Sequence, residues 1–364
     1  MFTSVEGGRL KILLLSRYGR LGSSSRLRML QYMEHFREHG VIIEHSPLLD
    51  DSYLVDLYAN AGRRRFLPLA AAYLYRLRAL AHCGRYDLLW IEKELFPALP
   101  AWAERFVSAM RIPYVVDYDD ATFHYYDLHK NSMIRGLLGG KIDSVMRRAA
   151  LVVAGNSYIA DRARAAGARR VEVLETVVDL DRYRVPEEKR RGVFTIGWIG
   201  IPFTARYLFD IEEALAEVCA EGRARVVLVG SGGMAFKGFS PEVREWSEAT
   251  EAYDIGSFDV GIMPLPDEEW ERGKCGYKLI QYMACGKPVV ASPVGVNSEI
   301  VTDGQNGFLA KTCSDWVRWL GCLRDDETMR ERLGRCGRRL VEERYCTRVA
   351  APRLLELLVS AARK

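Results

Sequence analysis

Short, uninterrupted apolar runs separated by helical patterns make up most of this chain. The first run, Arg9 to Ser16 (RLKILLLS), is long enough for a strand buried on both faces and too short for a helix. A turn follows, and apolar residues three positions apart from Leu27 to Phe36 predict a helix that ends at Gly40. The pattern is therefore strand, loop and helix, and strands of this kind are typical of parallel sheets.

The same alternation continues through the first half of the chain. Apolar runs predict further strands at 41–44, 87–91, 113–117, 151–154 and 171–174, with helices at 65–82, 100–110, 132–149 and 157–166. Repeated units of a strand followed by a helix predict a doubly wound α/β domain.

A second series of strands and helices follows a polar, charge-rich stretch at 179–192, which we interpret as a linker. The predicted strands are 193–199, 225–229, 260–264 and 288–291, and the predicted helices are 205–221, 275–285, 314–321, 326–344 and 348–362. We therefore expect an α/β chain with two Rossmann-like domains, 1–185 and 192–345, that face each other across a cleft. The terminal segment 346–364 is expected to pack back on the first domain.

Composition excludes several classes of protein. The net charge is +4 with 27% charged residues, which fits neither a disordered acidic chain nor a strongly basic nucleic-acid binder. The longest apolar stretch, Leu67 to Tyr75, is too short to cross a bilayer, and the chain does not start like a secretory signal. Eight cysteines without a C-x-x-C pair argue against a zinc site or a disulfide framework. We expect a cytoplasmic protein with no metal, no nucleic-acid partner and cysteines that serve as small buried residues.

The most informative stretch runs from Gly273 to Asn297 (GKCGYKLIQYMACGKPVVASPVGVN). A loop here leads into a helix whose first amide groups, together with Lys274 or Lys278, could hold an anion. The sequence therefore predicts a phosphate-bearing ligand.

The order of segments around this stretch carries a family resemblance. FDVGIMPL, a Glu-rich loop, a helix ending in YMACGKPVVAS, and EIVTDGQNGFLA together resemble the donor half of retaining GT-B glycosyltransferases of family 4, also called group 1. The resemblance implies transfer of a sugar from a nucleoside diphosphate sugar to a hydroxyl of a saccharide or lipid-linked acceptor. It also implies retention of configuration, no cofactor or metal, and a role in bacterial cell-surface polysaccharide synthesis.

The chain departs from this family at a pair of glutamates eight positions apart, which fall here on Gly273 and Gln281. Gln281 could still hydrogen-bond a ribose hydroxyl, and Glu269 or Glu271 could replace the other carboxylate. Lys278 lies one turn before Gln281, and the resemblance favours it for a diphosphate contact. The alternative is an idle, solvated lysine.

Two further glycine loops of the second half resemble the family's nucleotide-binding turns. Gly200 ends a predicted strand, and Thr204 is predicted as the cap of the following helix, with Arg206 as a charge partner. Gly230 and Ser231 end the next strand. Taken alone, each loop is equally typical of a simple tight turn.

In the first half, the loop from Gly22 to Arg26 opens a helix and corresponds to the family's loop against the diphosphate or the acceptor. The alternative is a serine-rich cap with a solvated arginine.

Asp117-Tyr118-Asp119-Asp120 follows a predicted strand, at the edge of a parallel sheet where ligands bind. The family often has a histidine and an acid here, and the resemblance places them on Asp119 and Asp120. Asp119 is our candidate for the acceptor base, and His124 could instead supply an imidazole. Salt bridging is the favoured interpretation of the nearby Glu92, Lys93 and Glu94.

Arg63 to Arg78 (RRRFLPLAAAYLYRLR) is a basic amphipathic pattern. It could lie on an anionic membrane surface, which would place the protein at the inner face of the cytoplasmic membrane. A core helix with a rim of solvated arginines has the same periodicity, so both interpretations stay open.

Two other functions share parts of this pattern. A nucleotide-sugar 2-epimerase has the same fold but needs one substrate only. A degenerate family member would bind a nucleotide sugar without turnover, and the missing glutamate pair favours this alternative.

Overall fold

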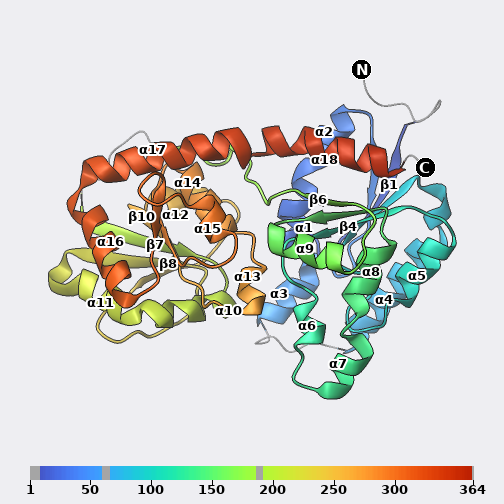
Figure 1. The fold of residues 1–364 in the computed structure, drawn as a ribbon, viewed down its shortest axis with the longest axis horizontal. Coiled ribbons are helices and arrows are strands. Elements are labelled where there is room, and N and C mark those ends of the chain that lie inside the picture. The colour runs from blue at the N-terminus through green and yellow to red at the C-terminus, as the bar shows by residue number, and fades with distance from the viewer. Residues whose placement is uncertain (1–8, 60–65, 186–191, 363–364) are drawn as a thin grey trace. The chain divides into compact units, whose positions relative to one another are not determined.

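The structure is a computed structural model that describes residues 9–59, 66–185 and 192–362. The chain forms two compact units, one of Met1–Thr176 with Ala350–Lys364 and the other of Val177–Val349. Each unit contains one six-stranded parallel sheet with helices packed against it (Figure 1). The predicted α/β class with two doubly wound halves is therefore confirmed.

The sheet of the first unit has the strand order β2-β1-β3-β4-β5-β6. Its strands are β1 (Lys11–Leu15), β2 (Ile42–His45), β3 (Leu88–Glu92), β4 (Tyr114–Tyr118), β5 (Leu151–Ala154) and β6 (Val171–Val173). Its helices are α1 (Ser23–Arg28), α2 (Met33–Glu38), α3 (Asp51–Ala59), α4 (Phe66–Ala81), α5 (Trp102–Ala109), α6 (His124–Asp127), α7 (Ser132–Leu138), α8 (Lys141–Arg148) and α9 (Ser157–Ala165). The central strands are buried along their whole length, as their continuous apolar runs predict.

Two helices predicted as continuous are interrupted. The helix expected up to Gly40 breaks at Met29, where φ is −131°, next to the buried Arg28. The helix expected over 132–149 is divided into α7 and α8 by Gly139 and Gly140. A side-chain carbon on Gly139 would lie 2.5 Å from the Arg135 carbonyl oxygen, so the chain turns too tightly there for a larger residue.

The sheet of the second unit has the strand order β12-β11-β10-β7-β8-β9. Its strands are β7 (Phe194–Ile199), β8 (Ala224–Val229), β9 (Glu242–Arg244), β10 (Val260–Met263), β11 (Val289–Ala291) and β12 (Gly307–Leu309). Its helices are α10 (Pro202–Ala205), α11 (Glu212–Cys219), α12 (Glu251–Gly256), α13 (Glu269–Arg272), α14 (Tyr277–Ala284), α15 (Asn297–Ile300), α16 (Cys313–Asp325) and α17 (Glu327–Arg344), and α18 (Thr347–Ala362) follows them. The edge strands β9 and β12 were not predicted.

Part of the predicted linker belongs to the second unit. Val178 forms a parallel bridge with Cys346, and Tyr183 is 1% exposed. Residues 179–185 therefore belong to the second unit and are anchored by the buried Leu180 and Tyr183, although Asp181, Arg184 and Val185 are exposed. Residues 186–191 lie outside the described residues.

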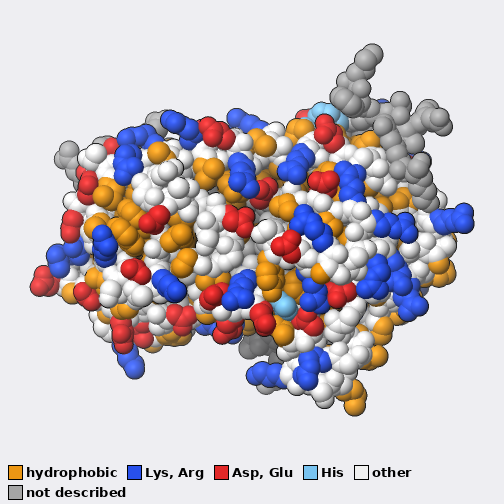
Figure 2. All heavy atoms as spheres, in the orientation of Figure 1, with side chains coloured by type: hydrophobic (Ala, Val, Ile, Leu, Met, Phe, Trp, Pro, Cys, Tyr) orange, Lys and Arg blue, Asp and Glu red, His pale blue; other side chains and the backbone are white. Residues whose placement is uncertain are grey.

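Side chains at the surface agree with the mild net charge. Lys and Arg are interspersed with Asp and Glu over the face shown in Figure 2. All eight cysteines are free, but Cys313 and Cys336 are exposed, so the expectation of buried cysteines is wrong for these two.

Candidate functional site

Three residues predicted to bind the donor converge at the carboxyl edge of the second sheet. Gly200 and Gly230 directly follow the paired strands β7 and β8. A side-chain carbon on Gly230, whose φ is +74°, would lie 2.3 Å from the Gly200 carbonyl oxygen. One on Gly200 would lie 2.9 Å from the Lys278 Cε atom. Glycine at both positions therefore lets two loops and a lysine share one small space.

Lys278 lies in the first turn of α14, as predicted. The helix begins after Gly276, which has a left-handed φ of 65°. The Lys278 ammonium lies 5.2 Å from the centre of the Trp198 ring, and the side chain is half-buried. A cation beside the first amides of a helix is an arrangement that favours an anionic ligand.

A buried carboxylate lies in α13, the short helix before α14. Glu271 is 2% exposed and its Oε1 atom accepts a hydrogen bond from the Tyr207 hydroxyl. Its Oε2 atom is buried without a hydrogen-bond partner. Burial and the bond to Glu271 raise the pKa of Tyr207 to about 12. Of the two glutamates predicted as replacements, Glu271 is therefore the buried one, since Glu269 is exposed.

Arg206 is connected to this carboxylate through Tyr207. Its Nη2 atom donates to the Tyr207 hydroxyl at 3.5 Å, and its guanidinium lies 4.3 Å from the centre of the Phe203 ring. Because Arg206 itself is exposed, it can reach a ligand at the same edge.

Gln281 is buried, at 4% exposure, and takes part in a core network. Its Nε2 atom donates to the Tyr183 hydroxyl at 2.8 Å, and this hydroxyl donates to Glu251 at 2.7 Å. The amide of Gln281 therefore holds Tyr183 in the core.

The remaining donor-side residues differ in their roles. Ile201, and not Thr204, caps α10, so the predicted cap is wrong; Thr204 lies inside the helix and donates to the Ile201 carbonyl. Ser231 is buried and donates to the Gly232 carbonyl. Lys274 is half-buried, with its ammonium 5.7 Å from the centre of the Trp270 ring.

In the first unit, the loop before α1 is compact. Gly22 caps α1, and a side-chain carbon there would lie 2.5 Å from the Tyr18 Cβ atom. Arg26 is 5% exposed and donates to the Arg20 carbonyl at 3.0 Å. The alternative of a solvated arginine is therefore wrong.

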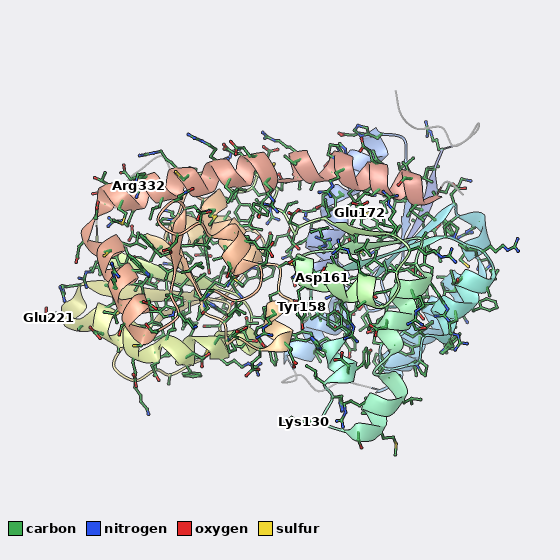
Figure 3. All side chains as sticks on the ribbon, viewed as in Figure 1. Lys130, Tyr158, Asp161, Glu172, Glu221 and Arg332 are labelled. Carbon is green, nitrogen blue, oxygen red and sulfur yellow. The ribbon has the colours of Figure 1, made fainter. Side chains whose placement is uncertain are left out.

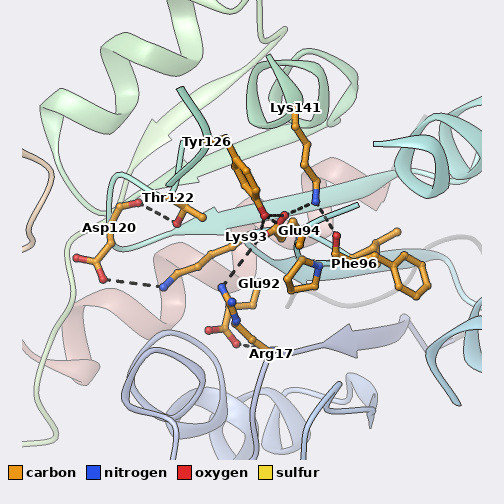
Figure 4. Close-up of polar contacts among 12 residues, drawn as sticks. Arg17, Glu92, Lys93, Glu94, Phe96, Asp120, Thr122, Tyr126 and Lys141 are labelled. Atoms are coloured by element: carbon orange, nitrogen blue, oxygen red, sulfur yellow. Dashed lines mark hydrogen bonds and ion pairs between the residues drawn. The ribbon is translucent and has the colours of Figure 1, made fainter. Parts of the chain in front are cut away.

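Lys93 contacts both predicted acids at the carboxyl edge of the first sheet, and Figure 4 shows its contact with Asp120. Its ammonium lies 2.8 Å from Asp119 Oδ1, 4.0 Å from Asp120 Oδ2 and 3.1 Å from the Ser24 hydroxyl. The Asp119 and Asp120 side chains are 15% and 34% exposed. Burial by itself would raise the pKa of Asp119, but the charge of Lys93 and hydrogen bonds from Lys93 and Ser24 hold it below its ordinary value. Asp119 is therefore held in an ion pair with Lys93, and Asp120 is the more accessible carboxylate.

Lys93 also has an unusual backbone, with φ at 62°. The left-handed region costs a side-chain-bearing residue on the order of 1 kcal/mol. The sequence reasoning interpreted Lys93 only as a salt-bridge neighbour of Glu92 and Glu94. That Lys93 lies beside Asp119 and Asp120 follows from the parallel register of β3 and β4, which pairs Glu92 with Asp117.

Two other buried ion pairs support this edge; the pair of Arg28 with Asp117 was not predicted, whereas salt bridging was expected for Glu94. Arg28 donates to both oxygens of Asp117, at 2.7 and 3.3 Å, and also to the Leu174 carbonyl. Glu94 contacts Lys141 and accepts from the Tyr126 hydroxyl (Figure 4). These contacts fix the ends of β3 and β4.

His124 is occupied at both ring nitrogens. Nδ1 is 2.8 Å from Asp127 Oδ1, and Nε2 is 2.9 Å from the hydroxyl of Tyr158, which Figure 3 labels. With a 7% exposed side chain, His124 packs inside the first unit.

The predicted basic amphipathic segment is partly α4. Arg63, Arg64 and Arg65 lie outside the described residues. Arg76 is 1% exposed and donates to the Ser16 and Ser46 carbonyls, so it belongs neither to a solvated rim nor to a membrane-facing surface.

An apolar cavity of about 710 Å³ opens between α3 and α4. Its apolar lining residues include Leu48, Leu49, Leu57, Leu74 and Tyr75. Leu74 and Tyr75 are 61% and 58% exposed, so the cavity has an exposed apolar rim.

The described part of the chain contains neither a candidate membrane-spanning helix nor a candidate metal-binding cluster. No helix in it is long and apolar enough to cross a membrane. Within the same ranges, no group of three or more His, Cys, Asp or Glu residues could hold a metal ion.

Comparison with known proteins finds a family similarity within the second unit. The family model described as glycosyl transferases group 1 matches residues 193–323. D-inositol 3-phosphate glycosyltransferases of Paenarthrobacter aurescens and of an Arthrobacter species are 36% and 34% identical over 98 residues, or 26% of this chain. This chain spans 21% and 20% of the length of these curated relatives.

Solved structures match nearly the whole fold. Anabaena HepE, crystallised with UDP and glucose, has a TM-score of 0.70 at 16% identity and covers 97% of this chain and 100% of its own. Sucrose-phosphate synthase of Thermosynechococcus elongatus has a TM-score of 0.71 at 14% identity, with 97% and 99% covered.

Proposed function

We propose that this chain, which has the GT-B fold and carries a group 1 glycosyltransferase domain, transfers a sugar from a nucleoside diphosphate sugar to a hydroxyl group. One observation carries the proposal: Gly200, Gly230 and Lys278 meet at the carboxyl edge of the sheet, inside the segment that matches the family. UDP is the proposed nucleotide, since the similar HepE was crystallised with UDP and with UDP-glucose.

On the donor side, the diphosphate lies against the two glycine loops and the start of α14. Lys278 and Arg206 supply positive charge, which matters because the leaving diphosphate gains charge in the transition state. Glu271 takes over hydrogen bonding to sugar hydroxyls from the glutamate absent at Gly273. Its buried, unpartnered oxygen supports this role.

On the acceptor side, Asp120 is the proposed proton acceptor. Asp119 is held by Lys93 at 2.8 Å, whereas Asp120 is 4.0 Å away and twice as exposed. In this proposal Asp119 holds Lys93 in place, and Asp120 accepts the proton of the acceptor hydroxyl. We propose a family 4 mechanism with retention of configuration, without a metal or cofactor.

The acceptor is a saccharide on a lipid carrier, used in bacterial cell-surface polysaccharide synthesis. The apolar cavity between α3 and α4 supports this choice, since a cavity of its volume suits a ligand of moderate size. It follows β2 at the carboxyl edge of the sheet, where ligands bind in such folds. Because such an acceptor is anchored in a membrane, we propose that the protein lies peripherally on the inner face of the cytoplasmic membrane.

A nucleotide panel tests the donor assignment. UDP, GDP, ADP and dTDP are compared by thermal shift and calorimetry with the parent chain and the Lys278→Ala variant. A ligand of the native state adds about 2.7 kcal/mol of stability at 100 times its dissociation constant, so binding is easily seen. The proposal expects UDP to stabilise the parent more than the variant. Failure of every diphosphate to raise the melting temperature would contradict it.

A further inference from the structure

A hollow of about 560 Å³ lies at the amino edge of the second sheet, and we call it the arginine hollow. Its described lining residues include four arginines and one acid: Arg223, Arg225, Arg324, Arg330 and Asp259. The formal charge of this lining is therefore strongly positive, although the whole chain carries only +4.

The arginine hollow is separate from the proposed donor site. Phe194, which lines it, begins β7, and Gly200 follows the other end of the same strand. At about 3.3 Å per residue, the six-residue strand places the two ends about 17–20 Å apart. A ligand in the hollow would not overlap the phosphates of a donor at the opposite edge.

Two of the arginines contact neutral groups, and Arg330 has no acid among its hydrogen-bond partners. Arg225 Nε donates to the Thr195 hydroxyl at 3.0 Å. Arg330 donates through Nη1 to the Leu323 and Arg324 carbonyls, and its guanidinium lies 5.5 Å from the centre of the Phe194 ring. Asp259 accepts a hydrogen bond from the Thr195 amide at 2.7 Å, so its carboxylate is engaged by the strand.

Three of the lining arginines form ion pairs with acids that are exposed. The acids paired with Arg223, Arg225 and Arg324 are Glu221, Glu242 and Asp325, at 3.6, 3.1 and 2.7 Å. Their side chains are 80%, 42% and 67% exposed, and Figure 3 labels Glu221. Exposed pairs of this kind contribute about 0–1 kcal/mol. A phosphate can therefore compete for these guanidiniums, which bind phosphate oxygens in a bidentate manner.

We propose that the arginine hollow binds a phosphate or diphosphate group. The group belongs either to a free phosphorylated molecule or to the headgroup of an anionic lipid. The proposal rests on the second unit alone and does not depend on the transfer reaction.

Calorimetry with inorganic pyrophosphate tests the proposal, on the full chain carrying Lys278→Ala so that the proposed donor site is weakened. The hollow variant adds Arg223→Gln and Arg225→Gln, two exposed residues whose replacement should leave the fold intact. A matched control adds Arg318→Gln and Arg335→Gln, which change the charge equally at exposed positions that do not line the hollow. Melting temperatures of all variants verify folding, and the single Arg223→Gln variant serves if the pair unfolds.

We expect pyrophosphate to bind the control and to bind the hollow variant about tenfold more weakly, as for the loss of hydrogen bonds to a charged group. Equal affinities of the two variants, or no pyrophosphate binding to either, would overturn the proposal. A failure of the proposed donor site is distinguishable from a failure of this proposal. The donor site is tested by UDP binding to the chain that retains Lys278, and that result does not alter the pyrophosphate comparison between the hollow and control variants.

Co-sedimentation with vesicles identifies the source of the phosphate. Binding to phosphatidylglycerol but not to phosphatidylcholine vesicles, weakened in the hollow variant, assigns the site to a lipid headgroup. Pyrophosphate binding that the hollow variant weakens, without vesicle binding, assigns it to a free phosphorylated molecule.

Discussion

Replacing Lys93 by methionine tests the charge arrangement at the edge of the first sheet. Methionine matches the unbranched stem of lysine closely, so the variant keeps most of the side chain and the backbone cost of the left-handed φ while it removes the charge. Lys93 and Asp119 are 10% and 15% exposed, so water screens their pair little. Removing one partner of a buried pair costs about 3–5 kcal/mol, because the other charge stays buried.

The loss should depend on pH in a defined direction. In the parent, the folded-state pKa of Asp119 is lowered, so the pair stabilises the chain above the unfolded pKa of about 3.9 and this stability is lost as pH falls through the folded value. In Lys93→Met, burial raises the pKa of Asp119, and stability is lost as pH rises through that value. The difference between parent and variant should therefore be largest near pH 7 and smaller near pH 4.

Urea unfolding at pH 4 to 8, followed by tryptophan fluorescence, measures this difference. Lys93→Arg is the matched control, since it keeps the cation and should stay within about 1 kcal/mol of the parent. A loss below about 1 kcal/mol in Lys93→Met, or one of equal size at pH 4 and pH 7, would refute the reasoning.

Three further variants test the second unit. Lys278→Ala should lower kcat/KM for the donor by about 10- to 100-fold with little change in melting temperature, and unchanged turnover would remove its phosphate role. Gln281→Glu should cost about 1–3 kcal/mol in urea unfolding without a gain in turnover, because the buried Tyr183 hydroxyl loses its amide donor; a more active variant would count against this. Gly230→Ala should cost about 1–3 kcal/mol and weaken UDP binding in calorimetry, since its new carbon would press on the Gly200 carbonyl; parental affinity would contradict the shared loop geometry.

Buried strands were predictable from the sequence, and the two short edge strands of the second sheet were not. Leu151–Ala154 matches its prediction because a continuous apolar run is required when both faces of a strand are covered. The three-residue edge strand Glu242–Arg244 is half-exposed and charged, so its sequence shows no apolar run. Helix breaks such as the one at Met29 depend on which neighbouring side chains are buried, and the helical period does not contain that information.

For the candidate site, too, local features were predictable from the sequence, and contacts between separate strands were not. Glycine loops and Lys278 were found because their spacing is local and follows single strands and one helix. Asp119 and Asp120 were found, but their contact with Lys93 was not, because Lys93 follows the neighbouring strand β3 and lies 25 residues before the end of β4 at Tyr118. Glu271 was predicted only as one of two alternatives, and burial now separates it from Glu269.

Turnover of a nucleotide sugar is the measurement that tests the central claim most directly. The full chain is incubated with UDP-glucose and other UDP-sugars, with and without a lipid-linked saccharide, and released UDP is followed by a coupled assay. The account predicts repeated turnover that Lys278→Ala suppresses. Binding of UDP without release of UDP from any of these sugars, under either condition, would contradict a transferase and leave a nucleotide-sugar binding protein of the same fold.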